Sequence, residues 1–180
     1  SEQEKEIIVE YLYVACWAKR RNKQYNESIR LCDYAQTVTE TEYDPRFDHI
    51  KFLAVFDIWF ERYGYNYSLL KNASYSIDDP IKYCLESYKG FGIYCSKFTE
   101  VEYTLEALEN SLTYLYALKA KTTIITGLEN NQSKLMVESS IEKANEFLNK
   151  LKERTHSNNN YWHEYPEYYH TEALLRLVEI

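Results

Sequence analysis

The stretch FDHIKFLAVFDIWFERY, residues 47–63, decides the fold of this chain. From Phe52 to Phe60 every position except Asp57 is apolar. Because a helix turns once every 3.6 residues, such a run leaves almost no polar face, and the helix must be covered on several sides. We therefore expect residues 47–63 to be the central helix of an all-α domain. The run is far shorter than the ~20 apolar residues that a membrane span needs, so we expect no membrane span.

Two further helical patterns precede this stretch. Residues 7–23 place five apolar side chains on one helical stripe: Ile7, Tyr11, Val14, Ala15 and Ala18. Residues 25–41 repeat the spacing with Ile29, Cys32, Tyr34, Ala35 and Val38. The short polar break at Asn22 predicts an antiparallel hairpin of the two helices. Asp44-Pro45 ends the second helix, because the residue before proline is pushed out of the helical region.

The second half of the chain also shows helical sequence patterns. Asp79-Pro80 is typical of a helix start, and 99–127 and the stretch after 129–132 keep a helical apolar spacing. We expect Pro166 to open a last helix. Four Gly and three Pro are too few for a sandwich or barrel. The expectation is an all-α single domain over 1–180, either stacked antiparallel hairpins or an irregular helical bundle. A longer parent chain stays open.

One segment carries a repeat-like pattern. Tyr25, Ser28, Ile29, Cys32 and Ala35 stand at offsets 0, 3, 4, 7 and 10. Offsets 0, 3, 7 and 10 recur with an aromatic residue followed by apolar ones at Phe98, Val101, Leu105 and Leu108. This pattern resembles the tetratricopeptide repeat over about 7–41 and, more weakly, 83–112. The resemblance implies a tetratricopeptide-like α-solenoid that binds a protein or peptide and implies no chemistry. The family's carboxylate-clamp residues are not carried over.

The net charge and the cysteines limit the kinds of partner and the cellular location that we expect. The formal net charge is −7 and the pI is about 5.2, which disfavours nucleic acid as a partner, since that needs a basic stripe. The four cysteines show no CxxC spacing and read as reduced core thiols. No secretory signal precedes the first helix, so we expect a cytoplasmic location unless a leader has been processed.

A second hypothesis rests on the C-terminal histidines. Glu153 and His156, and likewise Glu167 and His170, form two Glu-x-x-His motifs that place a carboxylate and an imidazole on one helix face. Helical bundles use two such motifs to hold a di-iron or di-manganese centre. This alternative is a helical-bundle metalloprotein or oxidase. Otherwise no catalytic residue and no cofactor is expected.

The tyrosines favour binding over catalysis. The chain has 19 Tyr, a residue enriched at interfaces because it joins a large apolar surface to a polar tip. Two clusters fall in predicted loops, and their contact candidates are Tyr65, Tyr67, Trp162, Tyr165 and Tyr169. The leading hypothesis is a non-catalytic scaffold that binds a protein or peptide. A helical part of a larger nutrient-binding or defence protein remains a third hypothesis.

Overall fold

The computed structural model describes residues 1–39, 43–63, 77–93, 101–126, 131–157, 171 and 174–176. Within these ranges all regular structure is helical and no strand occurs. The helices are α1 (Glu2–Arg21), α2 (Tyr25–Val38), α3 (Pro45–Tyr63), α4 (Asp78–Ile93), α5 (Val101–Thr126) and α6 (Asn131–Ser157). Residues 171 and 174–176 are helical as well. The predicted all-α class is confirmed.

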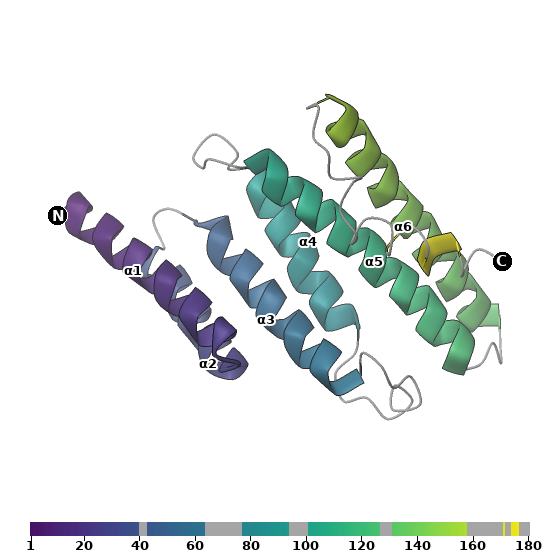
Figure 1. Ribbon diagram of the computed structural model, residues 1–180, viewed down its shortest axis with the longest axis horizontal. Helices are drawn as coiled ribbons and strands as arrows, with labels where there is room; N and C mark the ends of the chain where they lie inside the picture. Colours follow the sequence, from purple (N-terminus) through teal and green to yellow (C-terminus); the bar gives the residue numbers. More distant parts are fainter. Residues whose placement is uncertain are drawn as a thin grey trace.

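The helices stand side by side in chain order (Figure 1). Each packs against the next, adjacent helices run antiparallel, and α1 also contacts α3. The α1–α2 hairpin therefore forms one end of the row, and α5 and α6 lie toward the other. The predicted stack of antiparallel hairpins is confirmed.

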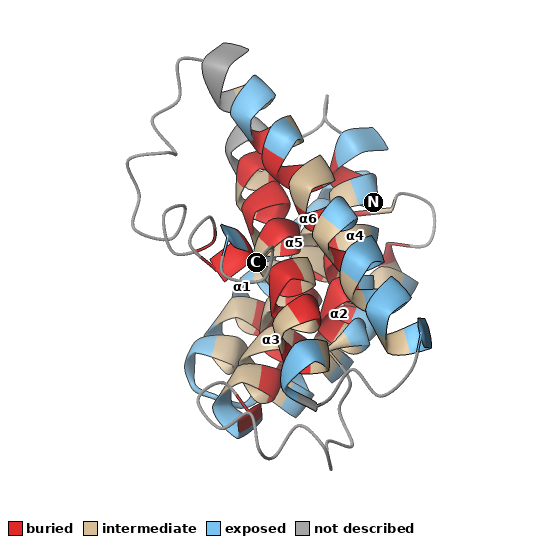
Figure 2. Cartoon of the chain, turned by 90° about the vertical axis from the view of Figure 1, so that its right-hand side faces the viewer, coloured by how far each residue is buried: buried red, intermediate tan, exposed pale blue. Residues whose placement is uncertain are grey.

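Helix α3 is the central element that its apolar run predicts. It packs between α2 and α4, and its buried residues cover most of its circumference: Pro45, Phe47, Ile50, Phe52, Ala54, Val55, Trp59 and Tyr63. Figure 2 shows buried residues on the faces that the helices turn toward one another and exposed residues on the outside. Phe47 and Ile50 join the core of the N-terminal hairpin, while Trp59 joins the core under α5 and α6.

Local signals fix the ends of the N-terminal hairpin. The Ser1 side chain and Glu4 form a capping box at the start of α1. After α1, Lys23 takes a left-handed φ of 60°. The backbone N–H of Lys23 then donates to the Arg20 carbonyl and that of Gln24 to the Lys19 carbonyl, each at 2.9 Å. This is the Schellman pattern that ends a helix and reverses the chain.

Helix α3 begins at a similarly defined point. The Asp44 carboxylate accepts a hydrogen bond from the Arg46 backbone N–H at 3.0 Å, and Pro45 fills the first helical position, where its missing N–H costs nothing. This cap orients the first turn of α3 against α1 and α2.

Helix α4 runs through both of its glycines to Ile93. A Cβ on Gly90 would lie 2.9 Å from the Pro45 Cβ and 2.9 Å from the Tyr43 hydroxyl, whereas one on Gly92 would meet nothing within 4 Å. Gly90 is therefore the notch that lets the Tyr43–Pro45 link lie directly on α4.

Candidate functional site

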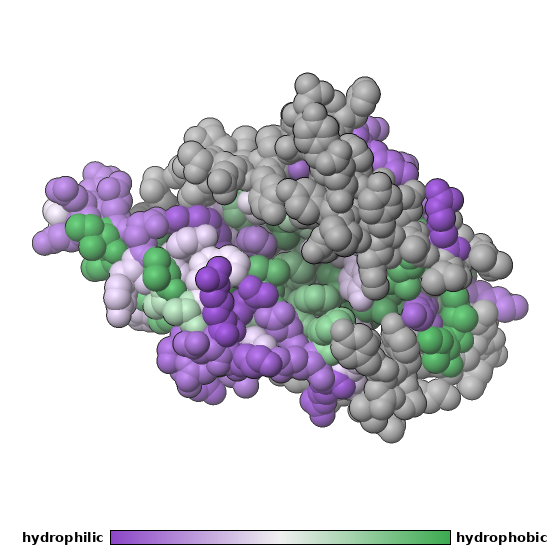
Figure 3. Space-filling view, viewed as in Figure 1, coloured by the Kyte–Doolittle hydropathy of each residue, from purple (hydrophilic) through white to green (hydrophobic). Residues whose placement is uncertain are grey.

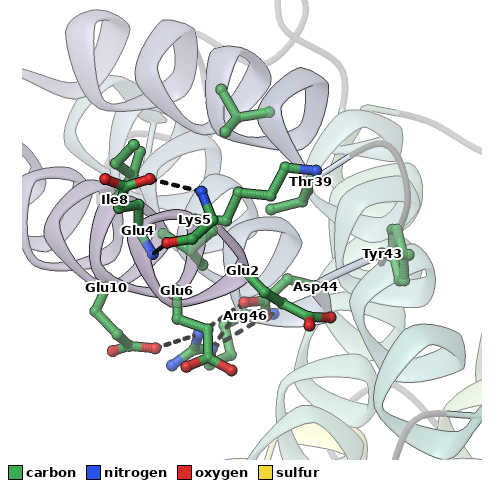
Figure 4. A pocket seen from close by; sticks show the side chains of 13 residues that line it. Glu2, Glu4, Lys5, Glu6, Ile8, Glu10, Thr39, Tyr43, Asp44 and Arg46 are labelled. Carbon is green, nitrogen blue, oxygen red and sulfur yellow. Dashed lines mark hydrogen bonds and ion pairs between the residues drawn. The ribbon is translucent and has the colours of Figure 1, made fainter.

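A cleft opens at the N-terminal end of the row, among α1, the last turn of α2 and the start of α3. Its volume is about 960 Å³. Ile8, Val9 and Val38 supply its apolar lining. Acidic side chains outnumber basic ones around them, and Figure 4 labels each of these charged residues: Glu2, Glu4, Glu6, Glu10 and Asp44 against Lys5 and Arg46. The cleft therefore favours a cationic or apolar group over an anion.

Arg46 ties the walls of the cleft together. Its Nη2 lies 2.7 Å from a Glu10 carboxylate oxygen and 2.7 Å from one of Asp44 (Figure 4). Burial acts to lower the pKa of Arg46, but the hydrogen bonds with Asp44 and Glu10 outweigh it and hold that pKa above its usual value. Because both carboxylates neutralise it within the chain, this guanidinium is a structural clamp between α1 and α3.

Two titratable residues follow in the first turns of α3. Tyr43 donates its hydroxyl to Asp48, and the Gln36 amide donates to the same carboxylate at 3.3 Å. Burial and the charge of Glu86 raise the pKa of Asp48 to about 6. His49 packs against the rings of Trp17, Phe52 and Phe91. Burial, together with the charge of Arg20, lowers the pKa of His49 to about 4, so its imidazole is neutral at pH 7.

The outer face of α1 is apolar and exposed. Ile7 is 65% exposed, Tyr11 73% and Val14 63%. The inward face of the same helix carries Leu12 and Cys16, which are buried. The apolar stripe of an amphipathic helix ordinarily faces the core, yet four of the five stripe residues that the sequence spacing singles out in α1 are exposed and the fifth, Ala15, is half-buried. Figure 3 shows hydrophobic surface at the left-hand end of the molecule, where α1 lies, next to polar surface.

The α5–α6 pair carries the opposite feature, a buried charge. Glu109 on α5 is fully buried. Arg154 on α6 binds its carboxylate through Nε at 3.0 Å and Nη2 at 2.7 Å, and the Tyr88 hydroxyl donates to it at 2.9 Å. Burial and this hydrogen bond raise the pKa of Tyr88 to about 12. The three side chains hold α4, α5 and α6 together, and their charges are matched within the chain.

The binding candidates predicted from the sequence lie elsewhere. Tyr65, Tyr67, Trp162, Tyr165 and Tyr169 all fall outside the described residues, so their role as a contact surface stays a prediction. What the sequence reasoning missed is the network of Arg46 with Glu10, residues 36 positions apart. No local spacing signals such a pair, because it forms only when α1 and α3 come together.

The metal site likewise stays a prediction. Glu153 is exposed on α6, and His156 belongs to the same helix, but its side chain lies outside the described set. Glu167 and His170 also lie outside the described residues. Among the side chains that the structure does describe, no group of three or more His, Cys, Asp or Glu residues is arranged to hold a metal ion.

Three cysteines match the expected core role. Cys16, Cys32 and Cys84 are free and buried. Burial raises the pKa of Cys84, and hydrogen bonding to Cys16 together with burial raises that of Cys32. Neither thiol is therefore poised as a nucleophile, since the thiolate is the reactive form.

Comparison with protein-family models, curated proteins and solved structures found no match to this chain. The class that the fold defines is thus an all-α protein of sequential helical pairs, with no family assigned. No helix in the described ranges has both the length and the apolar character needed to cross a membrane.

Proposed function

We propose that this chain is a protein- or peptide-binding helical scaffold and that the N-terminal hairpin carries its docking surface. The observation that carries the proposal is the exposed stripe of α1, where Ile7, Tyr11 and Val14 are each more than 60% exposed. Clustered large apolar side chains on a surface are typical of interaction sites. Folding of the chain does not require them there, because Leu12 and Cys16 already anchor α1 to the core.

The adjoining cleft strengthens this choice of surface. Ile8 belongs to the cleft lining and is itself 48% exposed, so the cleft and the stripe adjoin along the N-terminal half of α1. A partner that covers the stripe gains apolar burial of roughly 25 cal/mol per Å². The acidic rim of the cleft favours a protein or peptide with basic side chains at that edge and works against a nucleic-acid backbone.

The tetratricopeptide resemblance belongs to this proposal as well. Ser28 and Ala35, which stand at the small positions of the pattern, are buried in α2, as is Cys32 at the medium position, where the family often has Tyr or Phe. The Ser28 hydroxyl donates to the Cys16 carbonyl of α1 at 2.9 Å, which is a close approach of the kind that small residues permit. We keep the tetratricopeptide-like interpretation for the α1–α2 hairpin, and the tyrosines of the predicted loops would add contacts if they face the same partner.

Site-specific photo-crosslinking in cells that express the chain tests the proposal. A benzophenone amino acid replaces Tyr11 or Val14, and the control replaces Leu135 of α6, which is 64% exposed and lies outside the stripe. We expect discrete adducts from the two stripe positions and none from the control. The proposal is overturned if neither stripe position gives an adduct, or if Leu135 gives the same one.

A further inference from the structure

The outward face of α1 carries a seven-residue repeat. Its seam residues are separated alternately by three and four positions: Glu4, Ile7, Tyr11, Val14, Ala18 and Arg21. These are the a and d positions of a heptad, the spacing with which a helix presents a continuous seam to another helix. All six residues are exposed, so no described helix of this chain covers the seam.

The order of residues along this seam is self-complementary. It begins with an acid, continues through four uncharged positions and ends with a base. When the seam is laid antiparallel on a copy of itself, Tyr11 meets Val14 and Ile7 meets Ala18. Each end then brings Glu4 against Arg21. Two ion pairs thus flank a central set of apolar contacts.

The charged residues of the whole helix follow the same order as the seam, mostly acidic at the start and basic at the end. The first turn of α1 contains Glu2 and Glu4, and the last turn contains Lys19, Arg20 and Arg21. Within the chain, Lys19 and Arg20 already pair with Glu27 and Asp57, and Glu4 pairs with the Ser1 amino group. The contact that an antiparallel pair adds at each end is therefore the one between Glu4 and Arg21. A parallel pair would place Glu4 on Glu4 and Arg21 on Arg21, and like charges at such positions act against that arrangement.

We propose that the occupant of the α1 seam is a second copy of this chain, docked antiparallel across a two-fold axis. The proposal rests on the proposed function, since it names the partner of the same surface. A two-fold contact uses the same patch on both copies and closes after two, so the product is a discrete dimer and not a fibre.

The side chains that flank the seam fit this docking. On the side that faces α2 lie Ile8, which is 48% exposed, and the half-buried Ala15. On the side that faces α3 lies Trp17, with the guanidinium of Arg21 5.9 Å from its ring centroid. A second helix on the seam would cover these residues further and enlarge the apolar contact.

The size of the seam sets the expected strength. One helix face is small beside the ~800 Å² per partner of a standard interface. We therefore expect a reversible dimer that dissociates in the micromolar range and not an obligate one.

Sedimentation velocity on the purified chain over a range of concentrations provides the first test. We expect a monomer–dimer equilibrium whose dissociation constant rises at least tenfold in Tyr11→Lys and in Val14→Lys. Leu135→Lys, a matched change at an equally exposed apolar residue of α6, should leave it unchanged. Circular dichroism checks that each variant keeps its helical content, so that loss of the dimer is not loss of the fold.

Disulfide trapping then tests the orientation. A mixture of Ile7→Cys and Ala18→Cys chains should give a cross-linked heterodimer under mild oxidation, because the two positions face each other in the antiparallel pair. Ile7→Cys alone should give little, because the two copies of residue 7 lie at opposite ends of the interface. The unmodified chain measures the background from its own cysteines. Preferential self-linking of Ile7→Cys would overturn the antiparallel arrangement.

The two proposals fail separately. A chain that stays monomeric at every concentration overturns the second copy as occupant, as does insensitivity of the dimer to Tyr11→Lys and Val14→Lys. The docking function itself still stands in that case if photo-crosslinking at Tyr11 yields an adduct with a different protein. Absence of any adduct overturns both.

Discussion

The two ends of the helical row differ in what they bury and expose: one end buries a charged side chain, and the other exposes apolar ones. The α5–α6 pair buries charge, with Glu109 fully enclosed and bound by Arg154. The α1–α2 hairpin exposes apolar surface, with Tyr11 and Val14 more than 60% exposed. The buried charge is matched inside the chain, so it concerns stability. The exposed stripe has no such match among the described helices, and so it is the end that bears on a partner.

The largest expected loss of stability comes from breaking the buried ion pair between α5 and α6. Arg154→Met leaves the Glu109 carboxylate buried, and among the described residues only Tyr88 then donates a hydrogen bond to it. Stranding one member of a buried ion pair costs about 3–5 kcal/mol of unfolding free energy. Urea denaturation at pH 7 measures that loss.

The control variant also removes the Glu109 carboxylate, which Arg154→Met alone leaves buried without its ion-pair partner. The double variant Glu109→Leu with Arg154→Met should regain a large part of the lost stability, because neither charge then remains in the core. A single variant that loses less than about 1 kcal/mol would show that water reaches Glu109 after all.

The next effect lies in the middle of the row and depends on pH. His49 has a pKa of about 4 in the folded chain against 6.5 when unperturbed. Between those two pH values the unfolded chain binds more protons, so the contribution of His49 to stability grows as pH rises. His49→Phe keeps a ring among Trp17, Phe52 and Phe91 and should remove up to about 3 kcal/mol of acid sensitivity between pH 6.5 and 4.

Asp48, the neighbouring residue, provides the opposing control. Its pKa is raised to about 6 from 3.8, so over that window the folded chain binds more protons and the Asp48 contribution falls as pH rises. In His49→Phe, stability should therefore decline from pH 4 to 6, and in Asp48→Asn it should climb. Parallel pH profiles for the two variants, from thermal melts in matched buffers, would contradict the assignment.

A smaller effect separates the two glycines of α4. Gly90→Ala places a methyl group against Tyr43 and Pro45. Overpacking of this kind costs about 1–3 kcal/mol, which exceeds the roughly 1 kcal/mol that alanine gains over glycine in a helix. We expect a net loss of stability in Gly90→Ala and a gain of a few tenths to about 1 kcal/mol in Gly92→Ala. Equal effects in chemical denaturation would mean that the Tyr43 link does not rest on α4.

The smallest expected change in stability concerns the exposed stripe of α1 at the N-terminal end of the row. Val14→Lys should change the unfolding free energy by no more than about 0.5 kcal/mol, because an exposed side chain adds little to folding. Leu12→Ala, on the inward face of the same helix, should cost about 2–5 kcal/mol. The contrast is measured in dilute protein, where self-association does not contribute. A large loss in Val14→Lys would show that the stripe supports the fold itself.

Much of the fold was accessible from the sequence because its signals are local. The apolar run of residues 47–63 indicated a central helix, and the prolines at 45 and 80 both lie in the first turn of a helix. Gly90 is a different case, since it reads as a disturbance of the α4 pattern when considered alone. Its purpose becomes visible only against Tyr43, which comes from another part of the chain.

The candidate site was less accessible for a related reason. Helix α1 carries apolar residues on both sides, and periodicity identifies a stripe without saying which one faces the core. The choice is made by α2 and α3, which pack on Leu12 and Cys16 and leave Tyr11 and Val14 outside. Glu109 and Arg154, which stand 45 positions apart, likewise pair only through tertiary packing.

The buried cysteines can report on local opening of the fold, because a buried thiol reacts only when the helices around it separate. Cys16 and Cys32 lie in the core of the first hairpin, and Cys84, a residue of α4, lies in the core that α4 shares with α3 and α5. An alkylating reagent can therefore reach each thiol only when the helices around it open. Labelling rates, resolved by peptide mapping, would thus rank the local opening free energies of neighbouring helical pairs without any added probe. If the α1 seam is occupied in solution, protection of Cys16 should increase with protein concentration while that of Cys84 stays constant.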